Sequence, residues 1–175
     1  GRGDLETITQ VESLDVFRNL RTDLDRASQA VALLEAVDKV SQDGQMNIRL
    51  YKMLLGALRE LETRKSATIV AAFYFKLLAL EGFAPSFEDC VSCGAGSDLV
   101  AYAIEEGGVL CRNCRQGIPI SEEARQLILR MTKGGLTDAL AVEESHITHE
   151  VEALATLSLE HQIERRLRAL HVIDS

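Results

Sequence analysis

Two short stretches decide how this chain is organised: "CVSCGAG" at residues 90–96 and "CRNCRQG" at residues 111–117. They contain all four cysteines of the 175-residue chain, in the spacing C-x2-C-x17-C-x2-C. Four thiolates at this spacing are typical of a structural zinc site, because four protein ligands fill a tetrahedral ion and leave no open position. The sequence therefore predicts one structural Zn²⁺ bound by Cys90, Cys93, Cys111 and Cys114.

The residues between the two cysteine pairs predict a β-hairpin. "LVAYAI" alternates, "EEGG" is a turn and "VLC" returns, while Gly94 can supply a tight turn after the first pair. Two such turns joined by a hairpin make a zinc ribbon, expected over residues 86–117. Haem attachment is excluded because no His follows either pair, and a thioredoxin-like centre lacks its βαβ unit. An iron or iron–sulfur centre stays open, as do disulfides in an oxidising compartment.

The rest of the chain is predicted to be helical. Apolar residues at steps of three and four predict one long amphipathic helix from Asp15 to Ser41. Its stripe comprises Phe17, Leu20, Leu24, Ala27, Val31 and Leu34. A second helix is expected after Asn47, with an apolar face of Tyr51, Leu54, Leu55, Leu58 and Leu61.

Residues 66–81 are apolar nearly all round, which places a third helix at the centre of a bundle. Further helices are expected from the N-cap Ser121 to the "KGG" at residues 133–135, briefly within "LTDALAVEES", and from His149 to Val172. The predicted fold class is mainly α, a helical bundle with an inserted four-cysteine zinc ribbon. No apolar run is long enough to span a membrane.

The formal charge of −8 argues against a strong phosphate-binding surface over the whole chain. Only residues 111–133 are basic, with five basic and two acidic side chains. This segment is either a solvated face or a dock for an acidic peptide or phosphates. The candidate residues for binding a partner or DNA are Arg112, Arg115, Arg125, Arg130 and Lys133.

The sequence contains no GxSxG, HExxH or GxxxxGK motif, so we expect no enzymatic activity. The alternative is a metal-dependent or redox enzyme domain that uses the four cysteines. A third possibility is a sequence-specific DNA-binding zinc module, against which the negative charge argues.

The order of several segments resembles the bacterial RecO family of recombination mediators. These segments are "GRGDLETITQVE", "FRNLRTDLDRASQAVALLEAVDKV", "KLLALEGFAPSFEDCVSCG" and "GGVLCRNC". The resemblance implies an N-terminal OB-fold that binds single- and double-stranded DNA, of which residues 1–12 would be a remnant strand pair. It also implies a helical domain at residues 13–85 and 118–175 that carries the zinc ribbon at 86–117.

The resemblance further implies a non-enzymatic role in DNA repair and homologous recombination. Members of the family anneal complementary strands, work with RecR, contact the acidic C-terminal tail of single-strand-binding protein, and help to load RecA. By this resemblance the protein would be cytoplasmic and associated with the bacterial nucleoid. Its DNA contacts would lie mainly in the OB-fold.

Overall fold

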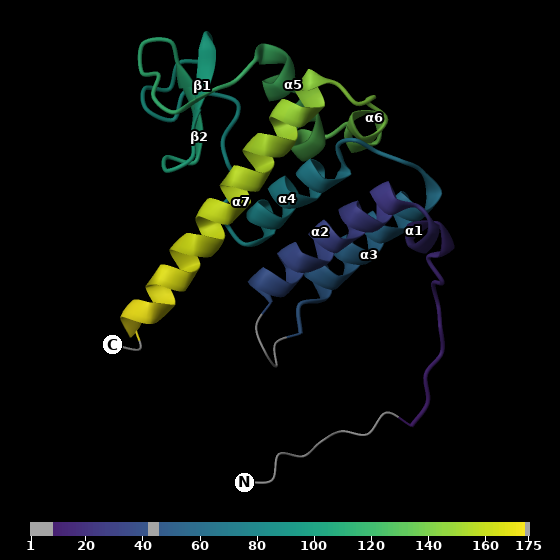
Figure 1. The fold of residues 1–175 in the computed structure, drawn as a ribbon. Helices are drawn as coiled ribbons and strands as arrows, with labels where there is room; N and C mark the ends of the chain where they lie inside the picture. The colour runs from purple at the N-terminus through teal and green to yellow at the C-terminus, as the bar shows by residue number, and fades with distance from the viewer. Residues whose placement is uncertain (1–8, 42–45, 174–175) are drawn as a thin grey trace.

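The computed structural model describes residues 9–41 and 46–173, and these form a mainly helical domain with one small antiparallel sheet (Figure 1). The predicted fold class is confirmed. In chain order the elements are α1 (Arg18–Thr22), α2 (Leu24–Val40), α3 (Ile48–Thr63), α4 (Ile69–Leu80), β1 (Leu99–Ala103), β2 (Gly108–Cys111), β3 (Ile118–Pro119), α5 (Glu122–Lys133), α6 (Leu136–Leu140) and α7 (His146–Ile173).

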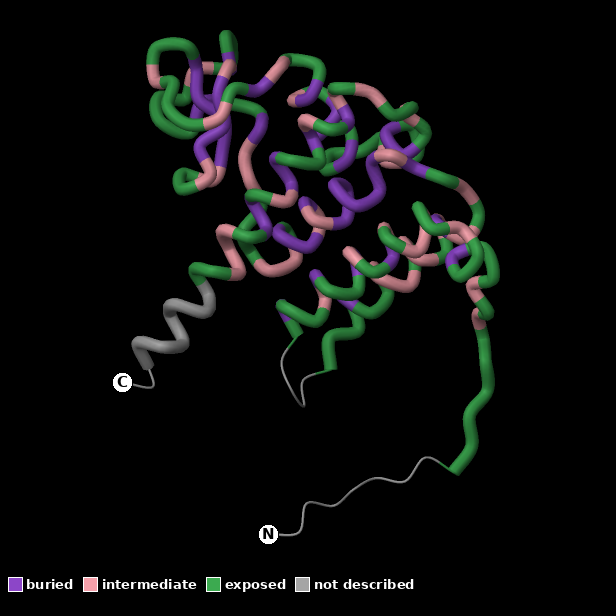
Figure 2. Tube along the Cα trace, in the orientation of Figure 1, coloured by how far each residue is buried: buried purple, intermediate pink, exposed green. Residues whose placement is uncertain are grey.

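Helix α4 lies at the centre of the domain, as its all-round apolar sequence predicts. Eight of its twelve residues are buried, which Figure 2 shows as an almost continuous buried stretch. It packs against α2, α3, α5, α6 and α7, so the helices that precede it and those that follow it share one core. Among the described residues, no helix combines the length and apolarity that crossing a bilayer requires.

The prediction of one helix from Asp15 to Ser41 is wrong, because the chain breaks at Asp23. This residue is extended (φ −113°, ψ 118°), and its carboxylate accepts hydrogen bonds from the backbone N–H groups of Asp25 and Arg26. An aspartate that satisfies the free N–H groups of a first turn is a strong N-cap. It therefore starts α2 as a helix separate from α1.

The predicted apolar stripe is also wrong on α2, where it faces outward. Leu24, Val31 and Leu34 are 84%, 51% and 48% exposed. A second apolar stripe on another side of the helix packs into the core instead. Its members are Ala30, Leu33, Ala36 and Val40.

The predicted caps of α3 and α5 are confirmed. The side chains of Asn47 and Ser121 accept hydrogen bonds from the first-turn N–H groups of α3 and α5, at 3.0 and 3.2 Å. Helix α7 begins three residues earlier than predicted. Ser145 and Thr148 form a reciprocal pair of side chain to backbone hydrogen bonds that caps its start.

The sheet contains the predicted hairpin and one strand that the sequence analysis missed. Strands β1 and β2 pair antiparallel, and the two-residue strand β3 pairs with the other edge of β1, giving the order β2-β1-β3. We call residues 86–119, which include this sheet and both cysteine pairs, the cysteine ribbon. Of the predicted strand remnant at residues 1–12, residues 1–8 lie outside the described part, and residues 9–12 are exposed and form no strand.

The cysteine ribbon and the helices share one hydrophobic core. The ring of Phe87 stacks on Tyr102 at a centroid distance of 5.3 Å, and its other contact is an edge-on pair with Phe75 of α4 at 5.5 Å. The Tyr102 hydroxyl lies 2.8 Å from the hydroxyl of Ser158 on α7. These contacts fix the sheet against α4 and α7 and so determine where the cysteines lie.

Candidate metal centre

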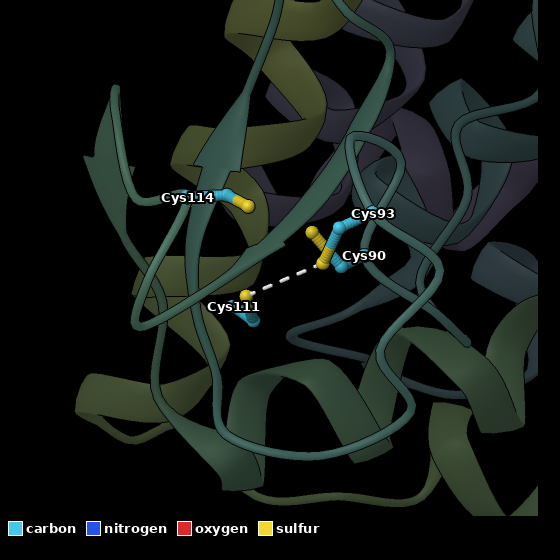
Figure 3. Close-up of side chains that lie close together, drawn as sticks. All are labelled: Cys90, Cys93, Cys111 and Cys114. Carbon is cyan, nitrogen blue, oxygen red and sulfur yellow. Dashed lines mark hydrogen bonds between the residues drawn. The ribbon is translucent and has the colours of Figure 1, made fainter.

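Two tight turns bring the four cysteines together at one end of the hairpin (Figure 3). In the first turn the N–H of Gly94 donates to the carbonyl of Cys90 at 2.8 Å, and Gly94 has the positive φ (76°) that its position predicts. In the second, the N–H of Cys114 donates to the carbonyl of Cys111 at 3.1 Å. The hairpin pairs Leu99 with Cys111, which places the second turn beside the first.

The four sulfur atoms lie within 4.8 Å of one another, and the Sγ atoms of Cys93 and Cys111 are 3.7 Å apart. All four thiols are free of disulfide bonds. Cys90 and Cys111 are buried, Cys114 is half-buried and Cys93 is exposed. Among the described residues, this is the only group of three or more His, Cys, Asp or Glu side chains close enough to share a metal ion.

The electrostatics of the cluster also favour a cation. The backbone N–H of Cys111 is the main cause that lowers the pKa of Cys90 from 9.0 to about 6. The N–H of Ala95 acts in the same direction on Cys93, but the neighbouring sulfurs of Cys90, Cys114 and Cys111 raise the pKa of Cys93 to about 12. Thiols this close oppose one another's ionisation, so full ionisation requires a positive ion between them.

The five basic residues predicted to bind a partner do not form one surface. Arg112 and Arg115 are exposed beside the second cysteine pair, whereas the other three lie on α5. On that helix, Arg130 lies about 140° around the axis from Arg125, because successive residues turn by about 100°. Lys133 is exposed and forms an ion pair with Glu88 at 2.9 Å.

Arg125 forms hydrogen bonds within the fold. Its side chain is only 12% exposed, and its guanidinium donates to the carbonyl of Phe87 at 2.7 Å and to both carboxylate oxygens of Glu122. The bonds from Arg125 to Glu122, with a smaller contribution from Gln126, lower the pKa of Glu122 from 4.5 to about 2. Arg125 therefore joins α5 to the start of the cysteine ribbon.

A groove that was not predicted from the sequence lies between α3, α4 and α6. It is a cavity of about 330 Å³ with a mostly apolar lining that includes Met53, Phe73 and Leu140. Lys52 and Lys76 also line it, one from α3 and one from α4. No local motif identifies this site, because its residues come from three helices whose packing decides that they meet.

The fold and the site together define a class of protein: a mainly helical domain built around a four-cysteine ribbon of metal-binding type. Residues 21–171 match the family model described as "Recombination protein O C terminal". The chain therefore belongs to the RecO family. The resemblance inferred from its segments is confirmed.

Relatives named "DNA repair protein RecO" match almost the whole chain. The protein of Streptomyces griseus subsp. griseus is 32% identical over 180 residues, which cover 99% of this chain and 72% of the relative. That of Desulforamulus reducens is 27% identical over 178 residues, covering 98% and 70%. The match to Roseiflexus sp. is 31% identical over 179 residues, covering 98% and 63%. The process in which this chain works is DNA repair and recombination.

Proposed function

We propose that this chain is a non-enzymatic mediator of recombinational DNA repair, whose cysteine ribbon holds one structural zinc ion. The observation that carries the proposal is the closed cluster of four thiols in a chain that belongs to the RecO family. In this proposal residues 13–85 and 118–175 form the helical domain, and residues 86–117 form the zinc-binding insert. The protein partners would dock on the helical domain.

The residues present fit zinc. A tetrahedral ion about 2.3 Å from each thiolate would separate the sulfurs by roughly 3.8 Å, and the Cys93 and Cys111 sulfurs are 3.7 Å apart. Soft thiolate ligands also select zinc over harder divalent cations. When bound, the ion would cross-link the two turns and balance the thiolate charge. The second turn adds the exposed cations Arg112 and Arg115 beside the same cluster.

Four protein ligands leave no coordination position for substrate, which favours the mediator over the alternative of a metal-dependent or redox enzyme. The two ideas differ in a measurable way. We expect about one zinc ion per chain by elemental analysis, slow exchange of that ion, and no change in its coordination on adding small anions. Displacement of a thiolate by an added anion would support the enzyme.

For the partners, we propose RecR, the acidic C-terminal tail of single-strand-binding protein, and DNA. The chain's charge of −8 favours protein docking over DNA binding by these residues, so the DNA contacts would belong mainly to an OB-fold. The groove between α3, α4 and α6 suits an acidic tail, because its floor is apolar and Lys52 and Lys76 line it. Glu60 also lines the groove, and its carboxylate is paired with Arg64. The exposed cations Arg130 and Lys133 of α5 offer the competing site.

Titration of a fluorescein-labelled acidic tail peptide tests this assignment. Lys52→Glu with Lys76→Glu should weaken binding by about tenfold or more, because charge reversal turns attraction into repulsion. The same loss with Arg130→Glu and Lys133→Glu would place the tail on α5 instead. Arg21→Glu with Lys39→Glu changes the net charge equally at exposed positions on α1 and α2, outside the groove lining, and serves as the control. Equal losses in all three variants would contradict specific docking.

A further inference from the structure

A second, larger cavity lies between the cysteine ribbon and the C-terminal helix. Its volume is about 510 Å³, and its walls are the end of β1, the turn after it, the approach to β3 and one side of α7. Figure 1 shows the hairpin standing beside α7. The metal centre is at the other end of the same hairpin, since Leu99 pairs with Cys111 there and Ala103 pairs with Gly108 at the turn. We call this cavity the ribbon–helix groove.

The floor of the ribbon–helix groove is apolar and accessible. Leu157 of α7 is 39% exposed there, and Ile104 and Ile118 line it from the ribbon as half-buried side chains. Gly117 also lines the groove at a φ of 98°, where a Cβ would lie 2.5 Å from the carbonyl oxygen of Tyr102. Only glycine permits this close approach of the chain to β1, so the shape of the groove depends on it.

The rim of the groove is acidic. Glu105 and Glu106 line it from the turn, and Glu160 lines it from α7; all three are exposed. None of these three forms an ion pair with a described basic side chain, and the described lining contains no lysine or arginine and one histidine, His161. Glu164, one helical turn beyond Glu160, also lines the groove.

The arrangement argues against two other ligands. The carboxylates do not converge on one point, because among the described residues only the cysteine cluster brings potential metal ligands together. A single divalent cation would therefore find no chelating set here. The negative rim also repels the phosphates of nucleic acid. An elongated ligand with several separated positive charges matches the spread of carboxylates better than either.

We propose that the ribbon–helix groove binds an extended segment of a protein partner in which lysine or arginine side chains flank an apolar one. The apolar side chain would cover Leu157, and the basic side chains would reach Glu105, Glu106 and Glu160. Both observations are needed: the accessible apolar floor provides hydrophobic contact, and the carboxylates of Glu105, Glu106 and Glu160, which have no described ionic partner, provide charge complementarity. This surface is distinct from the lysine-lined groove on α3 and α4. The lysine-lined groove would bind an acidic segment, whereas the ribbon–helix groove would bind a basic one.

The proposal is tested by fluorescence anisotropy. The whole chain with bound zinc is titrated into a fluorescein-labelled peptide of sequence GKKLKRG. The triple variant Glu105→Gln, Glu106→Gln and Glu160→Gln should weaken binding about tenfold, as expected for three partly exposed charge pairs. The control triple Glu12→Gln, Glu123→Gln and Glu143→Gln removes the same charge at exposed positions outside the groove lining. It should change the affinity less than about twofold.

The apolar part of the site has its own readout. Leu157→Ala should weaken the leucine peptide by about three- to tenfold and leave the matched peptide GKKGKRG unaffected, because only the first loses an apolar contact. Equal weakening by the two glutamine triples would overturn the proposal in favour of attraction by net charge. A Leu157→Ala variant that affects both peptides alike, or a wild-type protein that binds neither at about 1 mM, would also overturn it.

Discussion

The hydrogen bond between Tyr102 and Ser158 allows a quantitative test of how the cysteine ribbon is held. The Ser158 hydroxyl donates its one proton to the carbonyl of Leu154 at 2.6 Å. It must therefore accept from Tyr102, whose hydroxyl lies 2.8 Å away and whose side chain is 1% exposed. The two partners are therefore not equivalent. Removing the Ser158 hydroxyl leaves the buried Tyr102 hydroxyl without an acceptor, whereas removing the Tyr102 hydroxyl leaves the bond from Ser158 to Leu154 intact.

This asymmetry sets the expected free energies of unfolding. Ser158→Ala leaves a buried hydroxyl donor unsatisfied and should cost about 1–3 kcal/mol, whereas Tyr102→Phe removes that donor and should cost about 0.5–1.5 kcal/mol. The double variant should resemble Tyr102→Phe alone, because no donor then remains to be satisfied. For a domain of this size, each kcal/mol corresponds to a shift of about 2–4 °C in Tm.

Guanidinium unfolding at saturating zinc, followed by circular dichroism, gives these values if the slope of the transition stays constant. Ser28→Ala, on an exposed helix position, and Tyr51→Phe, at an exposed ring, are matched controls that should stay within about 0.5 kcal/mol of wild type. A larger cost for Tyr102→Phe than for Ser158→Ala would refute the donor assignment. Strictly additive costs would show that the two hydroxyls are not coupled.

The metal centre, one ion pair and two glycines can each be tested in the same protein. Removing the metal with a chelator should abolish the order of the cysteine ribbon and lower the Tm of the helices, because the ribbon and the helices share one core. Circular dichroism follows the helical Tm while a colorimetric assay follows the release of zinc. An unchanged helical Tm after zinc release would contradict the shared core. Arg125→Met should raise the pKa of Glu122 from about 2 toward 4.5 in an NMR titration. Since the folded pKa is depressed, the stability from this pair is present above pH 4.5 and is lost as the pH falls toward 2, so the variant should lose less stability in that window. Gly117→Ala should lower the free energy of unfolding by about 1–3 kcal/mol, because its Cβ would meet the backbone of Tyr102. By contrast, Gly56→Ala in open space on α3 should raise the free energy of unfolding by about 0.5–1 kcal/mol. A stabilising Gly117→Ala or a destabilising Gly56→Ala in the denaturation curves would refute the corresponding argument.

The cysteine cluster could be predicted from the sequence because its geometry is local. Each pair needs only a tight turn, for which Gly94 is adapted, and the short hairpin between the pairs fixes the distance between the turns. Helix caps were predictable for the same reason, since Asn47 and Ser121 act on backbone groups within the next three residues. These signals are independent of how the rest of the chain packs.

The packing of α2 could not be predicted in this way. The helix has two apolar stripes, and hydrophobic periodicity does not tell which of them meets α3 and α4. The more regular stripe, with Leu24, Val31 and Leu34, is the exposed one, and the smaller side chains of Ala30 and Ala36 are buried. Small residues allow close approach of neighbouring helices, a tertiary requirement that outweighs the larger hydrophobicity of leucine and valine.

The docking of the cysteine ribbon on the helices explains how a closed metal site can matter to binding without touching a partner. The hairpin is held at two ends: at one by the four cysteines, and at the other by Tyr102, which packs against Phe87 and bonds to Ser158. The two ends also differ in charge, with Arg112 and Arg115 beside the cysteines and Glu105 and Glu106 at the turn. A five-residue strand spans about 16 Å, too far for the ion to polarise a ligand in the ribbon–helix groove through solvent. Any effect of a bound metal on that groove would therefore pass through the position of the hairpin, which would make the ion part of the scaffold.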